Sequence, residues 1–397
     1  MTTSLANRFE YLTRQSRHIL VTVIAVFFFT SLILIIAGAP PLAAYYHIFK
    51  GSLGSWLKFA HVIKAWIPLT LCACGLIFTF RIGLWNIGIE GQVMMGAIFS
   101  TAALRFGLES QMPAMVIWLS IAAGLMGGAL WALIAGFLKT KGDVNEIFAG
   151  LGLNFVAQGI ILWLIFGPWK RPGVASMSGT EVFPPHLWLS QLASMRLSLP
   201  ALAIVCVSLI LTALILRYTK IGLNLKAVGS NPFAAYLFGL KPARNMVLAM
   251  IFAGGFAGIA GSLQVVGVYH RLLPAISSNY GYLALLVAML ANYNIWLVPP
   301  VALFFACLNV GSIQLPMALQ LDSSLSGVIQ GALVLATLFT PLLSLVRRWV
   351  DSWLHLEQFD PSRTLQEYGE SISNILEMQR LATRELERAV ARPNRTC

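Results

Sequence analysis

Long apolar segments recur along the whole chain and limit what it can fold into. The segment 19–38 contains no charged residue, and similar apolar runs follow at 62–80, 85–104, 114–138, 146–166, 198–217, 246–268, 281–291, 296–313 and 326–346. An α-helix rises about 1.5 Å per residue, so about 20 apolar residues cross the hydrocarbon core of a bilayer. The sequence therefore predicts an all-α protein, a polytopic transmembrane helical bundle of about ten spans.

The composition agrees with a membrane protein and argues against other classes. Hydrophobic residues make up 58% of the chain and charged residues 11%, whereas soluble domains carry about 25% charged residues. The net charge is +12, but the basic residues lie at the ends of apolar runs, which predicts contact with the lipid bilayer and no nucleic acid partner. The histidines and cysteines follow no metal-ligand or nucleophile pattern, so we expect no metal, no cofactor and no catalytic residue in this chain.

The distribution of basic residues predicts the orientation. More arginines and lysines fall on the inside than on the outside if residues 1–18 are a cytoplasmic N-terminus and both termini are cytoplasmic. The transmembrane domain then covers 19–348. The run 281–291 is too short to cross unaided, which predicts a broken or re-entrant helix there.

Three segments outside the apolar runs complete the predicted organisation. Residues 167–197 form a Pro- and Ser-rich external loop. Residues 218–245 form a basic cytoplasmic loop with its own helical pattern, in which Asn231 caps a short helix and Pro232 takes its first position. Residues 349–397 form a cytoplasmic polar helical tail, whose helix-like spacing favours a surface helix or a short coiled coil.

The segment FRIGLWNIGIEGQ at 80–92 is the most unusual part of the apolar region. Its glycines weaken a helix, and Asn86, Glu90 and Gln92 put polar groups at or near the bilayer, where unpaired charge is costly. One interpretation is a discontinuous helix beside a solute pathway, with Glu90 as a hydrogen-bonding hub. The other is a cytoplasmic turn in which Glu90 pairs with Arg81.

Further features concern helix packing and energy coupling. Asn154 and Gln158 are four residues apart, so they share one helix face and serve either as interhelical hydrogen-bonding groups or as part of a polar pathway. The segment AGGFAGIAG at 253–261 is typical of close helix packing. The chain contains no phosphate-binding loop, so ATP-driven transport would require a separate nucleotide-binding subunit.

Several motifs resemble one family of transporters. FRIGLWNIGIEGQVMMG at 80–96, PPLAAYYHIFKGSLGS at 40–55, VNEIFAGLGLN at 144–154, GPWKRPG at 167–173 and GLNLKAVGSNPFAAYLFGL at 222–240 are similar to motifs of the nucleoside and simple-sugar ABC transporter permeases, within the branched-chain amino acid/ribose permease superfamily. In that resemblance 40–55 is the first external loop. The chain departs from the pattern at Leu151-Gly152-Leu153 and at Lys226.

The resemblance implies a multi-pass permease subunit in the cell inner membrane that takes up nucleosides or simple sugars from an external solute-binding protein. It implies two further partners, an ABC ATPase subunit that binds ATP-Mg and a second permease subunit, expected to be a paralogue. The predicted solute pathway consists of Trp85, Asn86, Glu90, Gln92, Asn154 and Gln158. The predicted ATPase-coupling residues are Asn224, Lys226, Gly229, Asn231, Pro232 and Ala235.

Two other classes of protein compete with this interpretation. A secondary transporter driven by an ion gradient would need buried carboxylates or histidines, and Glu90 is the lone intramembrane candidate. It would also leave the basic loop at 218–245 without a purpose. A scaffold that transports nothing would have no need of polar breaks in its spans.

Overall fold

The structure, a computed structural model, describes residues 40–173, 178–192 and 197–313, together with a few positions between 28 and 38. All of these belong to one compact unit, 1–337. The described part contains helices and no strand. Its elements are α2 (Pro41–Leu53), α3 (Trp56–Arg81), α4 (Ile89–Phe106), α5 (Pro113–Thr140), α6 (Glu146–Phe166), the 3₁₀ turn η1 (Pro185–Leu187), α7 (Leu199–Tyr218), α8 (Lys220–Ser230), α9 (Pro232–Leu237), α10 (Pro242–Gln264), the π-helical turn η2 (Val265–Tyr269), α11 (Tyr280–Leu290) and α12 (Val298–Ser312).

Five helices in the described part are long and apolar enough to cross a bilayer: α3, α5, α6, α7 and α10 continued by η2. The prediction of an all-helical, multi-pass membrane protein is therefore confirmed. Helices α11 and α12 are apolar but shorter, and the ten-span count and the cytoplasmic termini stay predictions. The N-terminus 1–18, the apolar run 326–346 and the tail 349–397 lie outside the described residues, as does most of the run 19–38.

The segment 40–55 is not a loop, contrary to expectation. Its residues 41–53 form α2, which begins after an extended Pro40 with Pro41 in its first turn and ends at Gly54. Proline is compatible with the first helical turn, and the alanines that follow favour a helix. Ser55 then caps α3, because its Oγ accepts a hydrogen bond of 3.3 Å from the backbone nitrogen of Lys58.

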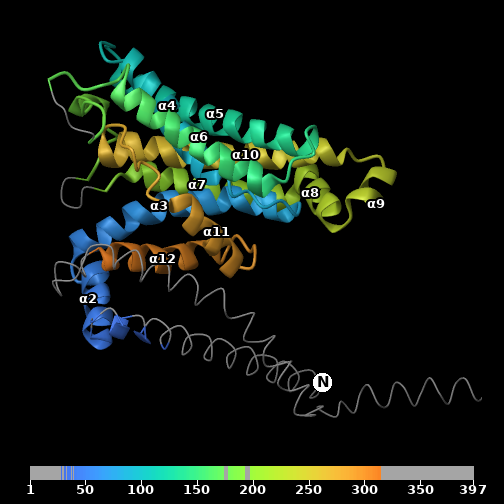
Figure 1. Ribbon diagram of the computed structural model, residues 1–397, viewed down its shortest axis with the longest axis horizontal. Coiled ribbons are helices and arrows are strands. Elements are labelled where there is room, and N and C mark those ends of the chain that lie inside the picture. The colour runs from blue at the N-terminus through green and yellow to red at the C-terminus, as the bar shows by residue number, and fades with distance from the viewer. Residues whose placement is uncertain are drawn as a thin grey trace, which may run out of the picture. The chain divides into compact units, whose positions relative to one another are not determined.

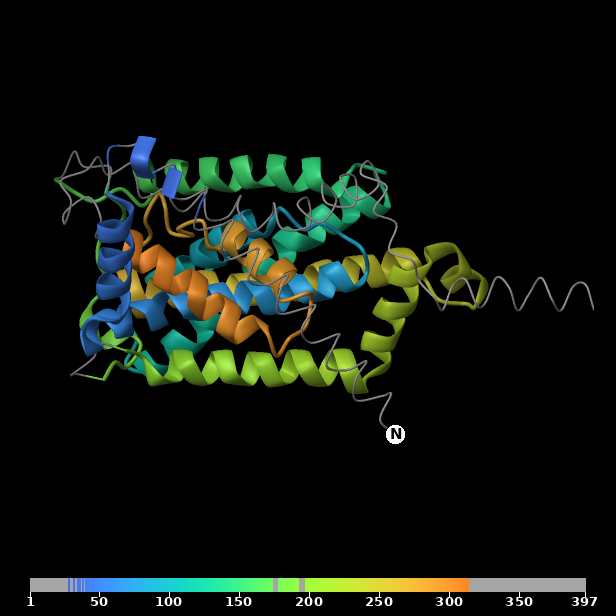
Figure 2. The same cartoon turned by 90° about the horizontal axis from the view of Figure 1, so that it is seen from below.

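Helix α10 lies among α3, α4 and α5, and glycines let these helices approach closely (Figures 1 and 2). A Cβ at Gly124 of α5 would lie 2.7 Å from Ser262 Cβ, 3.0 Å from Gly258 O and 3.1 Å from Gly96 O. Gly124 therefore contacts both α10 and α4 with its backbone. The close packing predicted for 253–261 is confirmed.

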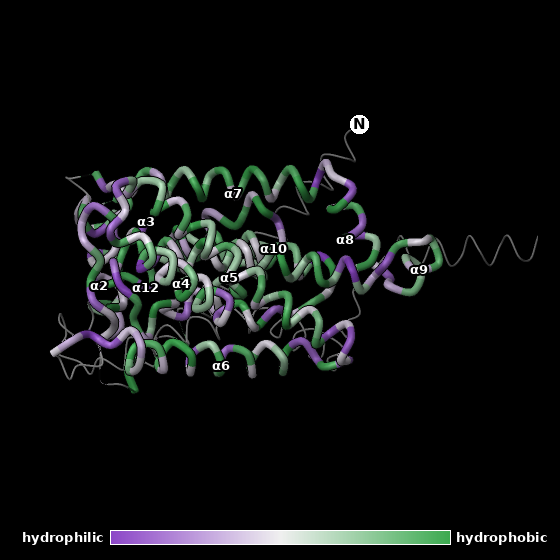
Figure 3. The backbone as a smooth tube through the Cα atoms, turned by 90° about the horizontal axis from the view of Figure 1, so that it is seen from above, coloured by the Kyte–Doolittle hydropathy of each residue, from purple (hydrophilic) through white to green (hydrophobic). Residues whose placement is uncertain are grey.

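Two segments predicted to lie outside the membrane are at opposite ends of the long helices. Helices α8 and α9 are at one end, and the irregular chain between α6 and α7 is at the other (Figures 1 and 2). Helices α6 and α7 flank the bundle, and most of their length is coloured as hydrophobic in Figure 3. Only 33% of the apolar window of α6 and 22% of that of α7 are buried within the protein, so the remaining apolar surface of these helices is suited to lipid.

Candidate functional site

The site begins at the turn that joins α3 to α4. Gly83 adopts a left-handed conformation with φ of 82°, which glycine accepts without strain. Asn86 and Gln92 are each 1% exposed and exchange two amide hydrogen bonds: Asn86 Nδ2 donates to Gln92 Oε1 at 3.0 Å, and Gln92 Nε2 donates to Asn86 Oδ1 at 2.9 Å. These two hydrogen bonds hold the α3–α4 connection against the N-terminal residues of α4.

Glu90 reaches from α4 to the beginning of α11. Its side chain is 2% exposed, and its Oε2 accepts a hydrogen bond of 2.8 Å from the backbone nitrogen of Gly281. The N-cap residue of α11, Asn279, has φ of 59° and supplies no side-chain cap. Glu90 therefore provides the cap that α11 lacks locally, and its negative charge lies at the positive end of the helix dipole.

The segment 82–88 is a turn between two helices, as in the second interpretation, but Glu90 bonds the start of α11, as in the first, and not Arg81. The Ser277 hydroxyl and the backbone amides of Asn279 and Tyr282 also face the Glu90 carboxyl group. Arg81 is exposed at the end of α3. The buried carboxylate is thus compensated by the beginning of α11 rather than by a cation.

Asn154 of α6 joins the same two helices. Its Oδ1 accepts a hydrogen bond of 2.8 Å from Gly91 N, and its Nδ2 donates to Ile87 O and to the Tyr282 hydroxyl, both at 3.0 Å. The donors of its side-chain amide are therefore used within the protein. The structure brings α4, α6 and α11 together through consecutive residues, since Glu90 holds α11 and Gly91 holds α6.

The remaining two predicted pathway residues are more accessible. Gln158 is half-buried and donates from Nε2 to Pro274 O at 3.1 Å. It lies one turn from Asn154 on the same face of α6, and the two side chains contact neighbouring stretches of chain: Pro274 before α11 and Tyr282 within it. Trp85 is 40% exposed and packs edge-on against Phe80 at 5.5 Å between ring centroids.

The chain between α10 and α11 is irregular, and the segment preceding α7 supplies its hydrogen bonds. Helix α10 ends in the π-helical turn η2, followed by His270 with φ of 54°. Backbone carbonyls released there accept hydrogen bonds, namely Val266 O from Leu189 N (2.9 Å), His270 O from Phe183 N (2.8 Å) and Leu272 O from Thr180 N (2.9 Å). Gln191 Nε2 donates to Gly267 O at 2.9 Å. A broken helix in a membrane protein requires such partners, and the predicted external loop provides them.

His270 lies at this end of the bundle against Trp188. The two rings are stacked, with centroids 3.9 Å apart and planes 10° apart. Burial lowers the pKa of His270, the Val266 carbonyl raises it and the charge of Lys64 lowers it further, with burial the largest effect. The imidazole is therefore stabilised in its neutral form.

The predicted coupling segment folds as two short helices at the other end. Asn231 Oδ1 accepts a hydrogen bond of 3.0 Å from Ala234 N, and Pro232 is in the first turn of α9, which confirms the predicted cap. Ala235 is buried and Lys226 exposed, and Asn224 is partly exposed. Large apolar side chains project from α9 and the residue that follows it: Phe233 (72% exposed), Tyr236 (65%), Leu237 (69%) and Phe238 (87%).

Helix α8 touches the turn that precedes α4. A Cβ at Gly229 would overlap Arg81 O and lie 3.0 Å from Ile82 Cα. The backbone of α8 thus rests directly on the end of α3. Gly229, predicted as a coupling residue from the resemblance, has a steric reason to be glycine here.

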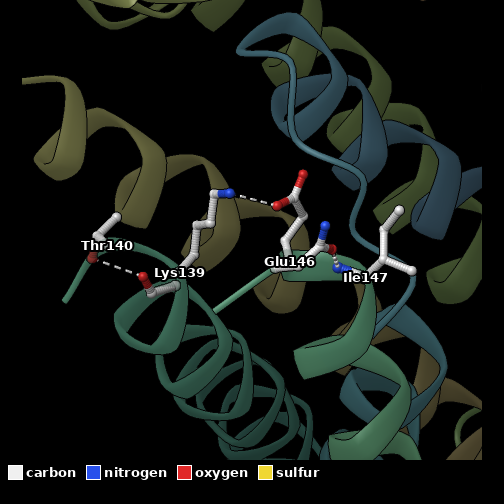
Figure 4. A network of polar contacts seen from close by, with 6 residues as sticks. Lys139, Thr140, Glu146 and Ile147 are labelled. Carbon is white, nitrogen blue, oxygen red and sulfur yellow. Dashed lines mark hydrogen bonds and ion pairs between the residues drawn. The ribbon is translucent and has the colours of Figure 1, made fainter. Parts of the chain in front are cut away.

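An ion pair between α5 and α6, shown in Figure 4, was not predicted from the sequence. Lys139 Nζ lies 2.8 Å from Glu146 Oε2. Beside it Asn145 caps α6, with Oδ1 accepting from Ile147 N at 2.9 Å. The pattern Asn-Glu before an apolar run is a helix-start signal that could have located the cap.

Tyr282 and Gly281 also belong to the site and were not predicted from the sequence. A cluster of polar residues, Ser277 to Asn279, immediately before the short apolar run was the available signal for a helix start inside the bundle. The described residues contain no group of three or more His, Cys, Asp or Glu placed to hold a metal ion.

The described residues form a polytopic membrane protein. It has apolar spanning helices, a capped short helix among them and an exposed pair of short helices at one end. Residues 59–338 match the family described as "Branched-chain amino acid transport system / permease component", and the chain belongs to that family. It is a permease subunit of the ABC transporter class and not an enzyme, since ATP hydrolysis belongs to a separate subunit in this class.

Three relatives illustrate the similarity. The glucose ABC transporter permease protein TsgB13 of Haloferax volcanii is 30% identical over 329 residues, covering 80% of this chain and 85% of the relative. The guanosine ABC transporter permease protein NupP of Bacillus subtilis is 25% identical over 334 residues, covering 82% and 94%. A second guanosine permease protein of that organism, NupQ, is 24% identical over 254 residues, covering 60% and 76%.

Proposed function

We propose that this chain is one permease subunit of an importer in the cell inner membrane that takes up nucleosides or simple sugars. It works with an ABC ATPase subunit that binds ATP-Mg, a second permease subunit that is a paralogue, and an external solute-binding protein. The relatives support the solute class, because their names specify glucose or guanosine. Two different guanosine permeases in one organism support a paralogous pair.

The exposed apolar side chains of α9 carry the proposal. Phe233 in α9 and Phe238 just after it are exposed, and α9 lies with α8 at one end of the bundle (Figure 1). An exposed aromatic cluster of this kind is suited to a protein partner. The ATPase changes conformation when it binds ATP, and because it binds α8 and α9 it moves them. The end of α3 lies against Gly229 of α8, so it moves with α8. Asn224 and Lys226 offer a polar edge to the same partner.

The six pathway residues divide by what their side chains contact. Asn86, Gln92 and Asn154 are buried and their amides hydrogen-bond to protein groups. Glu90 is buried and accepts a hydrogen bond from Gly281 N through Oε2. These four residues shape the backbone beside the pathway. Trp85 and Gln158 are accessible and carry the direct contacts with the solute. The indole ring of Trp85 can stack on a nucleobase or a sugar, and the amide of Gln158 can hydrogen-bond to it. Both side chains are neutral, so neither places an unpaired charge in the bilayer.

The test is uptake of radiolabelled guanosine, uridine, glucose and ribose by proteoliposomes that contain the full complex. We expect uptake that requires ATP and the binding protein. Phe233→Ala should lower uptake several-fold, whereas Phe148→Ala, a residue of α6 equally exposed at 72%, should leave it unchanged. Uptake that ignores ATP and follows a proton or sodium gradient would contradict the proposal and indicate a secondary transporter.

A further inference from the structure

We propose that the segment 81–92 transmits the movement of α8 to the half-helix α11, and that Glu90 is the positioning residue at the end of this relay. The inference rests on the proposed function, because it assigns a route between ATPase docking and the membrane interior. Its three steps are the contact of α8 with the turn, the rigidity of the turn, and the attachment of α11.

The first step is a contact between backbones. Gly229 of α8 lies against Arg81 O and Ile82 Cα, too close for a Cβ. Its helix is anchored there by Leu225 and Val228, which are both fully buried. No flexible side chain lies between the two backbones at this point, so a displacement of α8 displaces the end of α3 by a similar amount.

The second step is the stiffness of the turn itself. Ile82, Leu84 and Asn86 are buried, and the reciprocal amide pair between Asn86 and Gln92 closes the turn onto α4. A Cβ at Gly88 would lie 3.0 Å from Gly150 Cα, so α6 supports the turn from the other side. The turn and the first turn of α4 therefore move as one piece.

The third step is the attachment of α11. Helix α11 has 11 residues, which is about half of what a bilayer crossing needs, and irregular chain precedes it. Glu90 Oε2 holds its first turn through Gly281 N. A Cβ on Gly281 would lie 2.5 Å from that oxygen and 2.9 Å from Glu90 Cα, so the two helices meet without an intervening side chain.

The consequence is that α11 follows α4 rather than the chain that precedes it. Tyr282, 36% exposed on α11, is tied to Asn154 of α6. A shift of α4 relative to α6 therefore strains the hydrogen bond between Tyr282 and Asn154. Discontinuous helices of this kind have two discrete positions available in transporters, which a displaced anchor can select.

Two variants perturb the attachment from opposite sides. Glu90→Gln keeps the volume and one acceptor oxygen but removes the charge, and Gly281→Ala forces the first turn of α11 away. Glu109→Gln, the same chemical change at an exposed residue, is the matched control. Wild type and variants are compared as the complete complex in nanodiscs and proteoliposomes.

Hydrogen–deuterium exchange of the first amides of α11 measures the attachment, and the number of solute molecules taken up per ATP hydrolysed measures the relay. We expect Glu90→Gln to accelerate exchange about tenfold, since a hydrogen bond to a charged group is lost. It should lower uptake per ATP several-fold while leaving ATP hydrolysis intact. The double variant should lower uptake no further than either single variant, because both break one link.

The first step of the relay, the contact of α8 with the turn, can be perturbed separately. Gly229→Ala combined with Glu90→Gln should be less than additive for uptake per ATP, but additive for thermal stability. Unchanged exchange in Glu90→Gln, or additive losses of uptake per ATP, would overturn the proposal. If the wild-type complex shows no ATP-dependent uptake, the proposed function fails, while the exchange measurement still decides whether Glu90 attaches α11.

Discussion

Gly124 offers a quantitative test of the packing that holds the spanning helices together. In Gly124→Ala the new methyl group would lie 2.7 Å from Ser262 Cβ, 3.0 Å from Gly258 O and 3.1 Å from Gly96 O. Ordinary contact begins at 3.4 Å. The neighbours belong to two other helices, and none is the end of a flexible side chain. Helix α5 must therefore move away from both α4 and α10.

The expected magnitude follows from two opposing effects. Alanine favours a helix interior over glycine by about 1 kcal/mol, whereas overpacking a rigid contact costs about 1–3 kcal/mol. The control is Gly159→Ala in α6, where the added Cβ meets nothing within 4 Å. The propensity gain is common to both variants, so their difference isolates the packing effect of about 1–3 kcal/mol.

The assay is thermal unfolding of the purified protein in one detergent, followed by tryptophan fluorescence. We expect Gly159→Ala to melt at or slightly above the wild type and Gly124→Ala to melt below both. If Gly124→Ala melted as high as Gly159→Ala, the close approach of α4, α5 and α10 at this point would be refuted.

Three further predictions concern hydrogen bonds and charge. Asn154→Ala leaves Gly91 N buried without an acceptor and should destabilise the protein by about 1–3 kcal/mol, and Gln158→Ala, which removes one half-buried bond, should cost less in the same thermal assay. Burial lowers the pKa of His270, so the stability that the neutral imidazole contributes is complete above its ordinary pKa of 6.5 and declines as pH falls through 6.5 toward the lowered pKa. Protease cleavage within 178–192 should therefore increase in acid, and His270→Phe should flatten this pH dependence. Glu146→Gln removes the Lys139 partner at a partly exposed site, where ion pairs contribute about 0–1 kcal/mol, and a larger loss of thermal stability would contradict this estimate.

Local signals in the sequence located much of the fold. In the described part of the chain, runs of about 20 apolar residues located the five spanning helices, with ends that differ by at most six residues, because burial in lipid requires an unbroken apolar length. Asn231 and Pro232 predicted the start of α9 correctly, because a cap depends on residues three positions apart. The helix α2 at Pro41–Leu53 was not predicted. The segment 40–55 was assigned as a loop from a family motif, and its own helix-forming residues were not considered.

The sequence predicted one part of the candidate site, the residues within 80–92, but not the distant residues that contact them. Glycines and polar residues within 80–92 indicated a break in the helices and drew attention to Glu90. They did not reveal its partner, Gly281, which lies 191 positions away. Nor did they reveal Tyr282, which is 128 positions from Asn154.

The sequence by itself determined which long segments are apolar helices and that Glu90 is a carboxyl group among them, since each depends on neighbouring residues. Tertiary structure alone decided that this charge caps a half-helix and that two consecutive residues of α4 hold α11 and α6. The physical reason is that a buried polar group must find a partner, but its identity depends on which distant segments the packing of the apolar helices brings within hydrogen-bonding distance.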